Sequence, residues 1–432
     1  MTPRWACAPR LWILWSVLFI TLGSIPCYSY SVLTHEAIID TVWDESIVKI
    51  LRQRFPEVTD EQLKDAHAYA YGGCIIQDMG YYPFGSHLFT NLTHYVRSGA
   101  FVLSLLREAS NVEEYAFALG AMAHYAADNT GHPVAINPSV PLLYSKLRQK
   151  YGNTISYGDN PTAHVRTEFG FDVLQVARGR YTSDAYRDFI GFKVSKPLLE
   201  RAFKSTYSID LKDVFLSLDL AIGTYRKTAS VIIPKASRIA WEIKRKEIEE
   251  AEPGITTDKF LFQLAPGKYE ETWGREYKKP GISSRLLSFV LRVMPRIGPF
   301  KATAFKTPTP ETEKLFLDSF TATVDRYRGL LATVETADLR LPDRNFDLGK
   351  PTEPGMYKLA DDAYASLVDH LAQHHFEDVL PVVREDILAF YSHTDAPIST
   401  KQRARQWEKL LSQLEELRNG SHVDAMPAKR KN

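Results

Sequence analysis

Cysteine is scarce in this chain of 432 residues, which holds only three. Cys7 and Cys27 fall within the first thirty residues, so Cys74 is alone in the rest of the chain and has no partner for an internal disulfide. This excludes a scaffold held together by disulfides. We expect apolar packing to hold the fold, with bound metal as a further source of stability.

The chain also lacks an excess of charge of either sign, since its formal net charge is only +1. No overall field therefore attracts nucleic acid or an anionic membrane surface, and we expect no stable nucleic-acid partner. Internal repeats and low-complexity tracts are missing as well, which excludes repeat architectures. Apolar residues make up 44% of the chain, enough for the core of one large or two ordinary domains.

One apolar run, LWILWSVLFITLGSI at 11–25, follows Arg4 and Arg10 and precedes small or polar residues around Ser29. This order is typical of a secretory signal. The run is short for a membrane-spanning helix of about 20 residues, so an uncleaved anchor is the less favoured alternative. We predict a signal peptide over residues 1–29 and export into the periplasm or the medium.

Apolar residues recur at three- and four-residue spacing from Thr34 onward, whereas strict alternation is rare. This periodicity predicts an all-α protein. Asn111 and Asn160 are suited to cap the helices that follow them, the second one directly before Pro161. The predicted helices lie near residues 35–54, 59–73, 94–109, 111–129, 139–151, 161–177, 182–192, 196–204, 210–250, 312–336, 355–375, 379–391 and 398–418.

Proline and glycine interrupt the helical pattern over residues 251–311, which predicts an insertion or linker. Within it, residues 283–305 are apolar and basic, which suits either a helix at a membrane interface or a core-packed helix with its arginines in solvent. Residues 312–419 predict a C-terminal helical region, and 420–432 a disordered tail. A first helical domain is expected over residues 30–250.

The densest chemical signal is the segment HYAADNTGHP, followed after a loop by HVRTE. His124 and Asp128 are four residues apart, as are His164 and Glu168, so each pair lies on one helical face with a rise of about 6 Å. His132 stands where we expect the first of these helices to end. Histidine and carboxylate are ligands of zinc in catalytic sites, and the cluster predicts a zinc hydrolase.

Other histidines are given less weight, because a lone histidine on a helix is more often structural than a ligand. His67 has no acidic partner at ligand spacing and is interpreted as structural. His370, His374 and His375 lie far from the cluster on an amphipathic pattern, which is typical of a solvated face.

These motifs, with an earlier GGCIIQDMGYYPFGSH and THEAI in the same order, resemble the zinc-dependent phospholipase C family. That family shares a helical fold and a three-zinc site with certain single-strand nucleases. The resemblance covers the chain from about Tyr30 to residue 250. It implies a multi-helix bundle with additional C-terminal helices, and up to three Zn²⁺ ions as cofactors.

The resemblance also implies three sets of metal ligands. Four parts of the family pattern have matching positions in this sequence: an early histidine, an aspartate before a histidine, an HxxxD helix and a final HxxxE. The implied sets are Asp78, His87, His124 and Asp128 for a first zinc, His132, His164 and Glu168 for a second, and Tyr30, His35 and Asp128 for a third.

Two of these ligands depend on a choice. His87 is preferred because the letters GSHLF surround it, and His94 stays open as the alternative. Tyr30 would bind through the amino group and carbonyl of the mature N-terminus, as the terminal residue does in the family. Cleavage after Ser29 would then complete the site.

The implied reaction is hydrolysis of a phospholipid or another phosphodiester by attack of a metal-bound hydroxide. Asp78 and Asp128 are the predicted catalytic residues, Asp128 as the bridge between two zinc ions and Asp78 as the group that orients or deprotonates water. Arg166 is placed to face the phosphate. Peripheral membrane contact is a further prediction, and the oligomeric state stays open.

Two alternatives remain. A single-strand nuclease of the same fold needs aromatic rings for base stacking, and Tyr81, Tyr82, Phe84 and Tyr157 offer them. A non-catalytic zinc-binding protein would instead hold its metal in a closed site of four protein ligands.

Overall fold

Helices carry most of the chain in the computed structural model, which describes residues 31–251, 304–392 and 395–419. The one sheet within these ranges is a hairpin in which β1 (Arg344–Asn345) pairs antiparallel with β2 (Lys350–Pro351). The all-α prediction is thereby confirmed. The predicted signal peptide, Tyr30 and the C-terminal tail lie outside the described residues.

The described elements follow the chain from α2 to α20. The α-helices are α2 (Val32–Val42), α3 (Val48–Arg54), α4 (Asp60–Gly73), α5 (His87–Tyr95), α6 (Ser98–Glu108), α7 (Val112–Gly131), α8 (Asn137–Leu143), α9 (Ser145–Tyr151), α10 (Pro161–Ala177), α11 (Asp184–Ile190), α12 (Lys196–Tyr207), α13 (Leu218–Lys227), α14 (Ile233–Ala251), α17 (Pro310–Thr333), α18 (Lys358–Gln373), α19 (Pro381–Phe390) and α20 (Ala404–Asn419). Short π-helical turns are η1 (Trp43–Ile47), η3 (His132–Ile136) and η5 (Thr228–Ile232), and 3₁₀ turns are η2 (Ile76–Tyr81), η4 (Leu211–Val214) and η8 (Ser399–Gln402).

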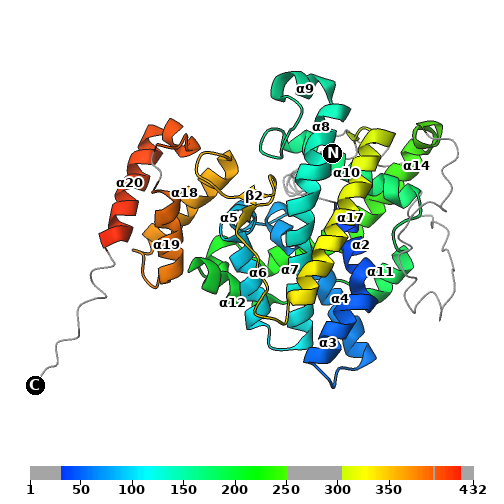
Figure 1. Cartoon of the computed structure of the whole chain (residues 1–432), viewed down its shortest axis with the longest axis horizontal. Helices are drawn as coiled ribbons and strands as arrows, with labels where there is room; N and C mark the ends of the chain where they lie inside the picture. Colours follow the sequence, from blue (N-terminus) through cyan, green and yellow to red (C-terminus); the bar gives the residue numbers. More distant parts are fainter. Residues whose placement is uncertain (1–30, 252–303, 393–394, 420–432) are drawn as a thin grey trace, which may run out of the picture.

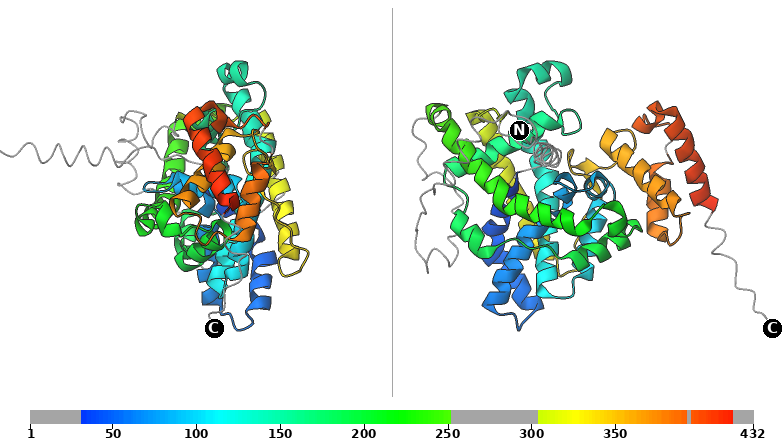
Figure 2. Two further views of the ribbon diagram at one scale, coloured as in Figure 1. Left: turned by 90° about the vertical axis from the view of Figure 1, so that its left-hand side faces the viewer. Right: turned by 180° about the vertical axis from the view of Figure 1, so that it is seen from behind.

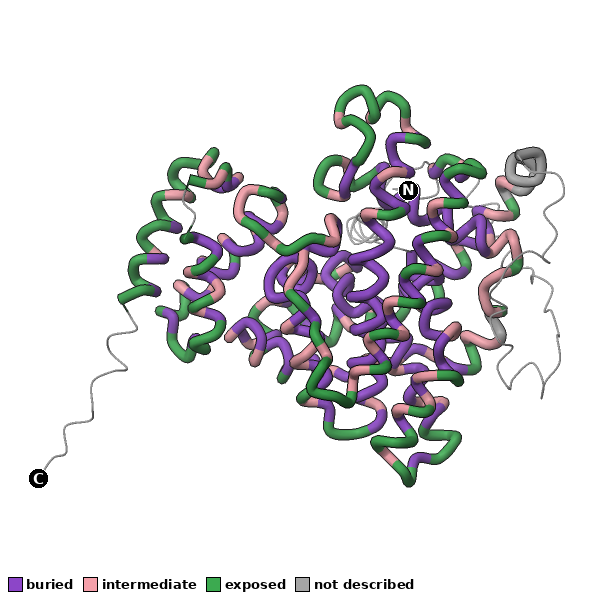
Figure 3. The backbone as a smooth tube through the Cα atoms, in the orientation of Figure 1, coloured by how far each residue is buried: buried purple, intermediate pink, exposed green. Residues whose placement is uncertain are grey.

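Helix α7 runs through the middle of the bundle (Figure 1) and is buried along its length (Figure 3). Its sequence is rich in alanine, the strongest helix former, and the Asn111 side chain caps it by accepting the Glu114 N–H at 2.8 Å, as predicted. Glu113 is its one residue that is not buried. A helix buried all round needs neighbours on every side, and α4, α6 and α17 supply them.

The approach of α4 to α7 depends on a glycine. A Cβ atom at Gly120 would lie 2.2 Å from the carbonyl oxygen of Ala70, which no side chain tolerates. The two helices therefore pack backbone against backbone at this level. One consequence is that the C-terminal end of α4, with Cys74 as its cap, lies beside His124.

The helix after the predicted linker joins the same core. Tyr327 of α17 donates its hydroxyl to the Leu119 carbonyl of α7 at 2.8 Å, and Phe316 stacks on Phe171 with ring centroids 4.7 Å apart. The main buried apolar cluster of the described residues draws on both parts of the chain, from Val32 to Leu417. Helices α18, α19 and α20 form a smaller group at one side of the bundle, seen from two further directions in Figure 2.

The helix predicted over 94–109 is broken in the structure. Arg97 has φ 50°, in the left-handed region, and separates α5 from α6. Its buried guanidinium donates Nε to the Thr206 carbonyl at 3.0 Å and Nη1 to the Val382 carbonyl at 3.3 Å. These bonds offset a backbone cost of about 1–2 kcal/mol. Periodicity alone gave no sign of this break.

The next α-helix ends where expected, since α7 stops at Gly131 with His132 as its C-cap, but helical turns do not stop there. The chain continues through η3 into α8, and the Asn137 N–H bonds to the His132 carbonyl five residues back. Pro133 has no N–H for the Asn129 carbonyl four residues before it, and a wider π-helical turn takes up the missing bond. Such turns are frequent at functional sites.

The apolar-basic segment predicted over 283–305 lies mostly outside the described residues. Its last residue, Phe305, is buried and contacts Phe169 of α10 with ring centroids 5.7 Å apart, which favours core packing at this end. Within the three described ranges, no helix is both long enough and apolar enough to cross a bilayer.

Candidate metal centre

Eight polar side chains from distant parts of the chain converge beside α7. Each exposes 2% or less of its surface, and their nitrogen and oxygen atoms form three groups, each within 4.8 Å. The groups are His35, His124 and Asp128; Asp78, His94 and His124; and His132, His164 and Glu168.

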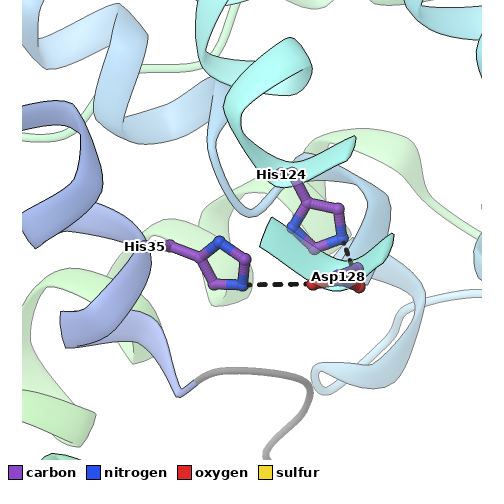
Figure 4. A group of neighbouring side chains, drawn as sticks. All are labelled: His35, His124 and Asp128. Atoms are coloured by element: carbon purple, nitrogen blue, oxygen red, sulfur yellow. Dashed lines mark ion pairs between the residues drawn. The ribbon is translucent and has the colours of Figure 1, made fainter. Parts of the chain in front are cut away.

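Asp128 lies between His35 and His124 in the first group (Figure 4), and His124 also belongs to the second group. Its Oδ1 is 3.6 Å from Nε2 of His35, and its Oδ2 is 3.1 Å from Nε2 of His124. The two imidazole rings stack with centroids 4.6 Å apart. Ligand atoms around a tetrahedral zinc stand about 3.3 Å apart, so the two oxygens of Asp128 can serve two different cations.

His94 completes the second group. Its Nε2 lies 3.2 Å from Oδ1 of Asp78 and 3.5 Å from both Oδ2 of Asp128 and Nε2 of His124. The geometry thus places His94, and not His87, with the other candidate ligands. His87 is the first residue of α5, is exposed, and touches Tyr81 edge-on at 5.9 Å. Seven residues, about two turns and 10 Å of helix, separate it from His94.

The third group has the composition expected from the sequence. His164 and Glu168 stand one turn apart on α10, with Nδ1 to Oε1 at 2.8 Å, after the predicted Asn160 cap, whose oxygen accepts the Ala163 N–H at 2.9 Å. His132 reaches the same Oε1 atom from η3, with its Nε2 at 3.8 Å.

Four histidines of the cluster each direct one ring nitrogen at the other ligand atoms and the second ring nitrogen at an oxygen of the protein. An acceptor on one nitrogen fixes the tautomer and leaves the lone pair of the other for a metal. The acceptors are the Cys74 carbonyl for Nδ1 of His124 at 3.1 Å, the Thr90 carbonyl for Nδ1 of His94 at 2.9 Å and Oδ1 of Asn137 for Nε2 of His164 at 3.0 Å. For His132 the partner is an ion pair, with Oδ1 of Asp347 3.0 Å from Nδ1.

Crowding of buried carboxyl groups governs the electrostatics of the site. Burial raises the pKa of Glu168 well above its usual value, and repulsion from Asp128, Asp78 and Asp347 raises it further. Burial also raises the pKa of Asp78, which attraction to His124 and His94 only partly offsets. Such a set of acids is costly to ionise unless positive charge lies among them.

Positive charge is attracted to the space between Asp78 and Asp128. Burial lowers the pKa of His94, but the close contacts with the carboxylates of Asp128 and Asp78 outweigh it and bring the pKa to about 10. For Asp128, burial acts to raise the pKa, yet the close contacts with His124 and His94 hold it well below its usual range. A divalent cation can supply the same charge at this position.

Hydrogen bonding within the protein leaves several site atoms unsatisfied. Both carboxylate oxygens of Asp128 and both of Glu168 are buried without a hydrogen-bond partner. A buried polar group in that state costs about 1–3 kcal/mol, which metal ligation removes. Burial together with the charge of His132 lowers the pKa of His164 to about 3, so His164 stays neutral, as a metal ligand must. The residues present therefore fit zinc.

The remaining predicted residues fall in different places. His67 pairs with Asp40 at 3.0 Å and stacks on Trp43 at 3.9 Å, as a structural histidine does. Arg166 is half-buried, and its charge lowers the pKa of Tyr144, which burial raises overall. His374 and His375 are exposed, whereas His370 is half-buried.

Of the four aromatic residues considered for base stacking, two border the metal centre and two do not. Tyr82 packs in the core against Tyr225 with ring centroids 5.2 Å apart. Tyr81 and Tyr157 contact each other at 5.9 Å and meet the edges of His94 and His164, so both border the metal centre. Phe84 is 42% exposed, with φ 64°.

Two residues beside the cluster were not predicted from the sequence. The hairpin loop between β1 and β2 carries Phe346, whose ring lies 5.2 Å from His94 and 6.0 Å from His124, and Asp347, the partner of His132. The letters NFDLG match no metal motif. Only the folding of the loop against α7 brings them beside the cluster.

Comparison with known proteins agrees with this centre. Residues 34–217 match the family described as zinc dependent phospholipase C, which confirms the resemblance drawn from the sequence motifs. The eight clustered residues all lie inside the matched range, and Asp347 lies outside it. No curated protein and no solved structure shows significant similarity to the chain.

Proposed function

On the premise that residues 34–217 belong to the zinc-dependent phospholipase C family, we propose that the protein is a zinc-dependent phosphoric diester hydrolase whose substrate is a phospholipid. The observation that carries the proposal is the position of Asp128, whose two oxygens face different histidines within one buried cluster. A closed structural site needs no such shared ligand.

The proposed ligands follow the three groups of the cluster, with His94 in place of His87. Tyr30, which lies outside the described residues, stays a proposed ligand of the ion beside His35. The proposed sets are Asp78, His94, His124 and Asp128 for one zinc, His132, His164 and Glu168 for another, and Tyr30, His35 and Asp128 for a third.

Zinc, when bound, supplies a lowered pKa for water and a positive charge for the phosphate oxygens. The residues supply position and proton transfer. Oδ2 of Asp78 is buried without a hydrogen bond, and burial raises the pKa of this carboxyl, which suits a group that accepts a proton from the attacking water. Asp128 fixes the zinc beside His35 relative to the zinc beside His124, because each of its two oxygens faces one of these histidines.

A phosphodiester brings negative charge into this site, and few basic side chains of the described residues are buried. Arg97 is the single buried arginine or lysine among the described residues, and it bonds to the backbone carbonyls of Thr206 and Val382 instead. Zinc ions would supply charge compensation in such a site, and the half-buried Arg166, two residues from His164, stays the proposed basic partner of the phosphate.

Phospholipid and single-stranded nucleic acid are the two candidate substrates. Tyr81 and Tyr157 border the site and could contact either a lipid head group or a base. The family favours phospholipid. Zinc-loaded protein should therefore release diacylglycerol from phosphatidylcholine vesicles, and should release no nucleotides from single-stranded DNA under the same conditions.

The control for this assay is an Asp128→Asn protein loaded in parallel, which should be inactive on both substrates. Nucleotide release by the wild type, lost in the variant, would assign the nuclease instead. Zinc binding without turnover of either substrate or of a chromogenic phosphodiester would assign a non-catalytic zinc protein. Export and peripheral membrane contact remain predictions from residues outside those described.

A further inference from the structure

We propose that Asp347, outside the matched family region, is a positioning residue that holds His132 for its metal and so makes the C-terminal part of the chain a component of the metal centre. The inference rests on the zinc-binding part of the proposed function. Oδ1 of Asp347 lies 3.0 Å from Nδ1 of His132, and both side chains are 3% exposed or less. The opposite ring nitrogen, Nε2, faces Glu168 at 3.8 Å.

The carboxylate is itself fixed in place. Its other oxygen, Oδ2, accepts the Tyr95 hydroxyl at 2.8 Å and also accepts the hydroxyl of Tyr357. Tyr357 is the N-cap residue of α18 and Tyr95 the last residue of α5. With one oxygen held by two phenols, the second can point only at the imidazole.

The backbone of Asp347 reaches a second histidine of the same group. Its carbonyl accepts Nδ2 of Asn137 at 2.7 Å, and Oδ1 of Asn137 faces Nε2 of His164 at 3.0 Å. One residue of the hairpin loop therefore orients two of the three side chains proposed for this zinc. Partners of this kind typically change metal affinity by about 10–100-fold when removed.

The loop is held against the site by contacts that are independent of the histidines. Ser98 bonds to both the carbonyl and the N–H of Arg344, at 2.7 and 2.9 Å, and the Ala100 N–H donates to Oδ1 of Asp343 at 2.9 Å. Gly349, with φ 63°, brings the loop so close to Asn129 that a Cβ would lie 2.6 Å from its carbonyl oxygen. These contacts supply a matched control for an experiment.

The test titrates zinc into the metal-free full chain against a chromophoric chelator, so that the affinity of each bound zinc is read without any activity assay. Asp347→Ala should weaken one zinc by about 10–100-fold and leave the others unchanged. Asp347→Asn keeps the volume and a hydrogen-bond acceptor but removes the charge, and should weaken the same zinc by about tenfold. Far-ultraviolet circular dichroism checks that each variant is folded.

The control is Asp343→Ala, which loosens the loop without touching a histidine and should leave all zinc affinities unchanged. A second readout is the ¹⁵N-edited spectrum of the imidazole rings, in which the hydrogen-bonded Nδ1 proton of His132 should be present in the wild type and lost in Asp347→Ala. Equal weakening by Asp343→Ala and Asp347→Ala, or folded Asp347 variants with unchanged affinities, would overturn the inference. A wild-type chain that binds no zinc would instead overturn the proposed function.

Discussion

Oδ1 of Asp128 lies 3.6 Å from Nε2 of His35, although the two residues belong to different helices, α2 at the start of the matched region and α7 near its middle. The other oxygen of Asp128 faces His124. A carboxylate whose two oxygens face different histidines can link two metal positions. The loss of its charge should therefore affect both metals.

Asp128→Asn should therefore lower the zinc content by two ions per chain and abolish phosphodiester turnover. The amide keeps the shape of the side chain but lacks the negative charge that the cations need. Zinc content by elemental analysis and turnover of a chromogenic phosphodiester measure the two effects. Asp44→Asn, at an exposed position of η1, is the control and should behave as wild type; loss of a single zinc in Asp128→Asn would contradict a bridging role.

His94→Ala and His87→Ala form a matched pair on one helix. His94 lies in the cluster and His87 is exposed, so only His94→Ala should lose zinc and reduce kcat/KM by several orders of magnitude. A drop of about 10³-fold corresponds to about 4 kcal/mol of transition-state stabilisation. If His87→Ala proves the more damaging of the two, the ligand set drawn from the structure is wrong.

Two glycines should respond to alanine in opposite directions. Gly349 has φ 63° and contacts Asn129, so Gly349→Ala should lower the free energy of unfolding by about 1–3 kcal/mol. Gly329 lies inside α17 with open space around it, and Gly329→Ala should raise that free energy by about 0.5–1 kcal/mol. Urea denaturation of the zinc-loaded proteins measures both, and a neutral Gly349→Ala would show that the loop is less tightly packed than described.

The stability of the protein should depend on pH through Asp386 of α19. Burial raises the pKa of this carboxyl to about 6, with a further rise from Asp343 that attraction to Arg97 opposes. In the unfolded chain the pKa of an aspartate is about 3.9. The folded state thus binds the proton more tightly, and stability is lost as the pH rises from about 4 to about 6.

Asp386→Asn removes this loss. The free energy of unfolding of the variant should exceed that of the wild type by about 1–3 kcal/mol above pH 6, and the two should converge near pH 4. The amide oxygen can still accept the Tyr364 hydroxyl, which lies 3.1 Å from Oδ2 of Asp386. Comparing the two proteins at each pH cancels the loss of zinc in acid, and a difference that grows toward low pH would contradict the assignment.

Removal of metal should destabilise the fold as well as stop the reaction. The acids of the cluster repel one another, and burial already raises the pKa of Glu168 and Asp78. Zinc binds the folded state and adds its binding free energy to stability. A chelator should therefore lower Tm by several degrees or more, and added zinc should restore it; an unchanged Tm would indicate that the cluster is stable without metal.

The sequence predicted the parts of the site that lie within one helix. His124 with Asp128, and His164 with Glu168, follow from a four-residue interval that the helix converts into a shared face. The caps at Asn111 and Asn160 were equally local. These predictions needed no knowledge of how the helices pack.

Contacts between distant segments could not be predicted in this way. The choice between His87 and His94 depends on where α5 lies against α7, and the break at Arg97 depends on carbonyls of Thr206 and Val382. Asp347 belongs to a loop whose own sequence is unremarkable for metal sites. The contacts of Arg97 and Asp347 span more than a hundred residues and those of His94 span tens of residues, and helical periodicity carries no information about either.

The central claim is that the histidines and acids around Asp128 hold several zinc ions in one buried centre. Diffraction from crystals of the zinc-loaded protein, recorded on both sides of the zinc absorption edge, tests this most directly. The account predicts three anomalous peaks, two beside the oxygens of Asp128 and one between His132, His164 and Glu168. Anomalous density that lies elsewhere, or none within the cluster, would contradict it.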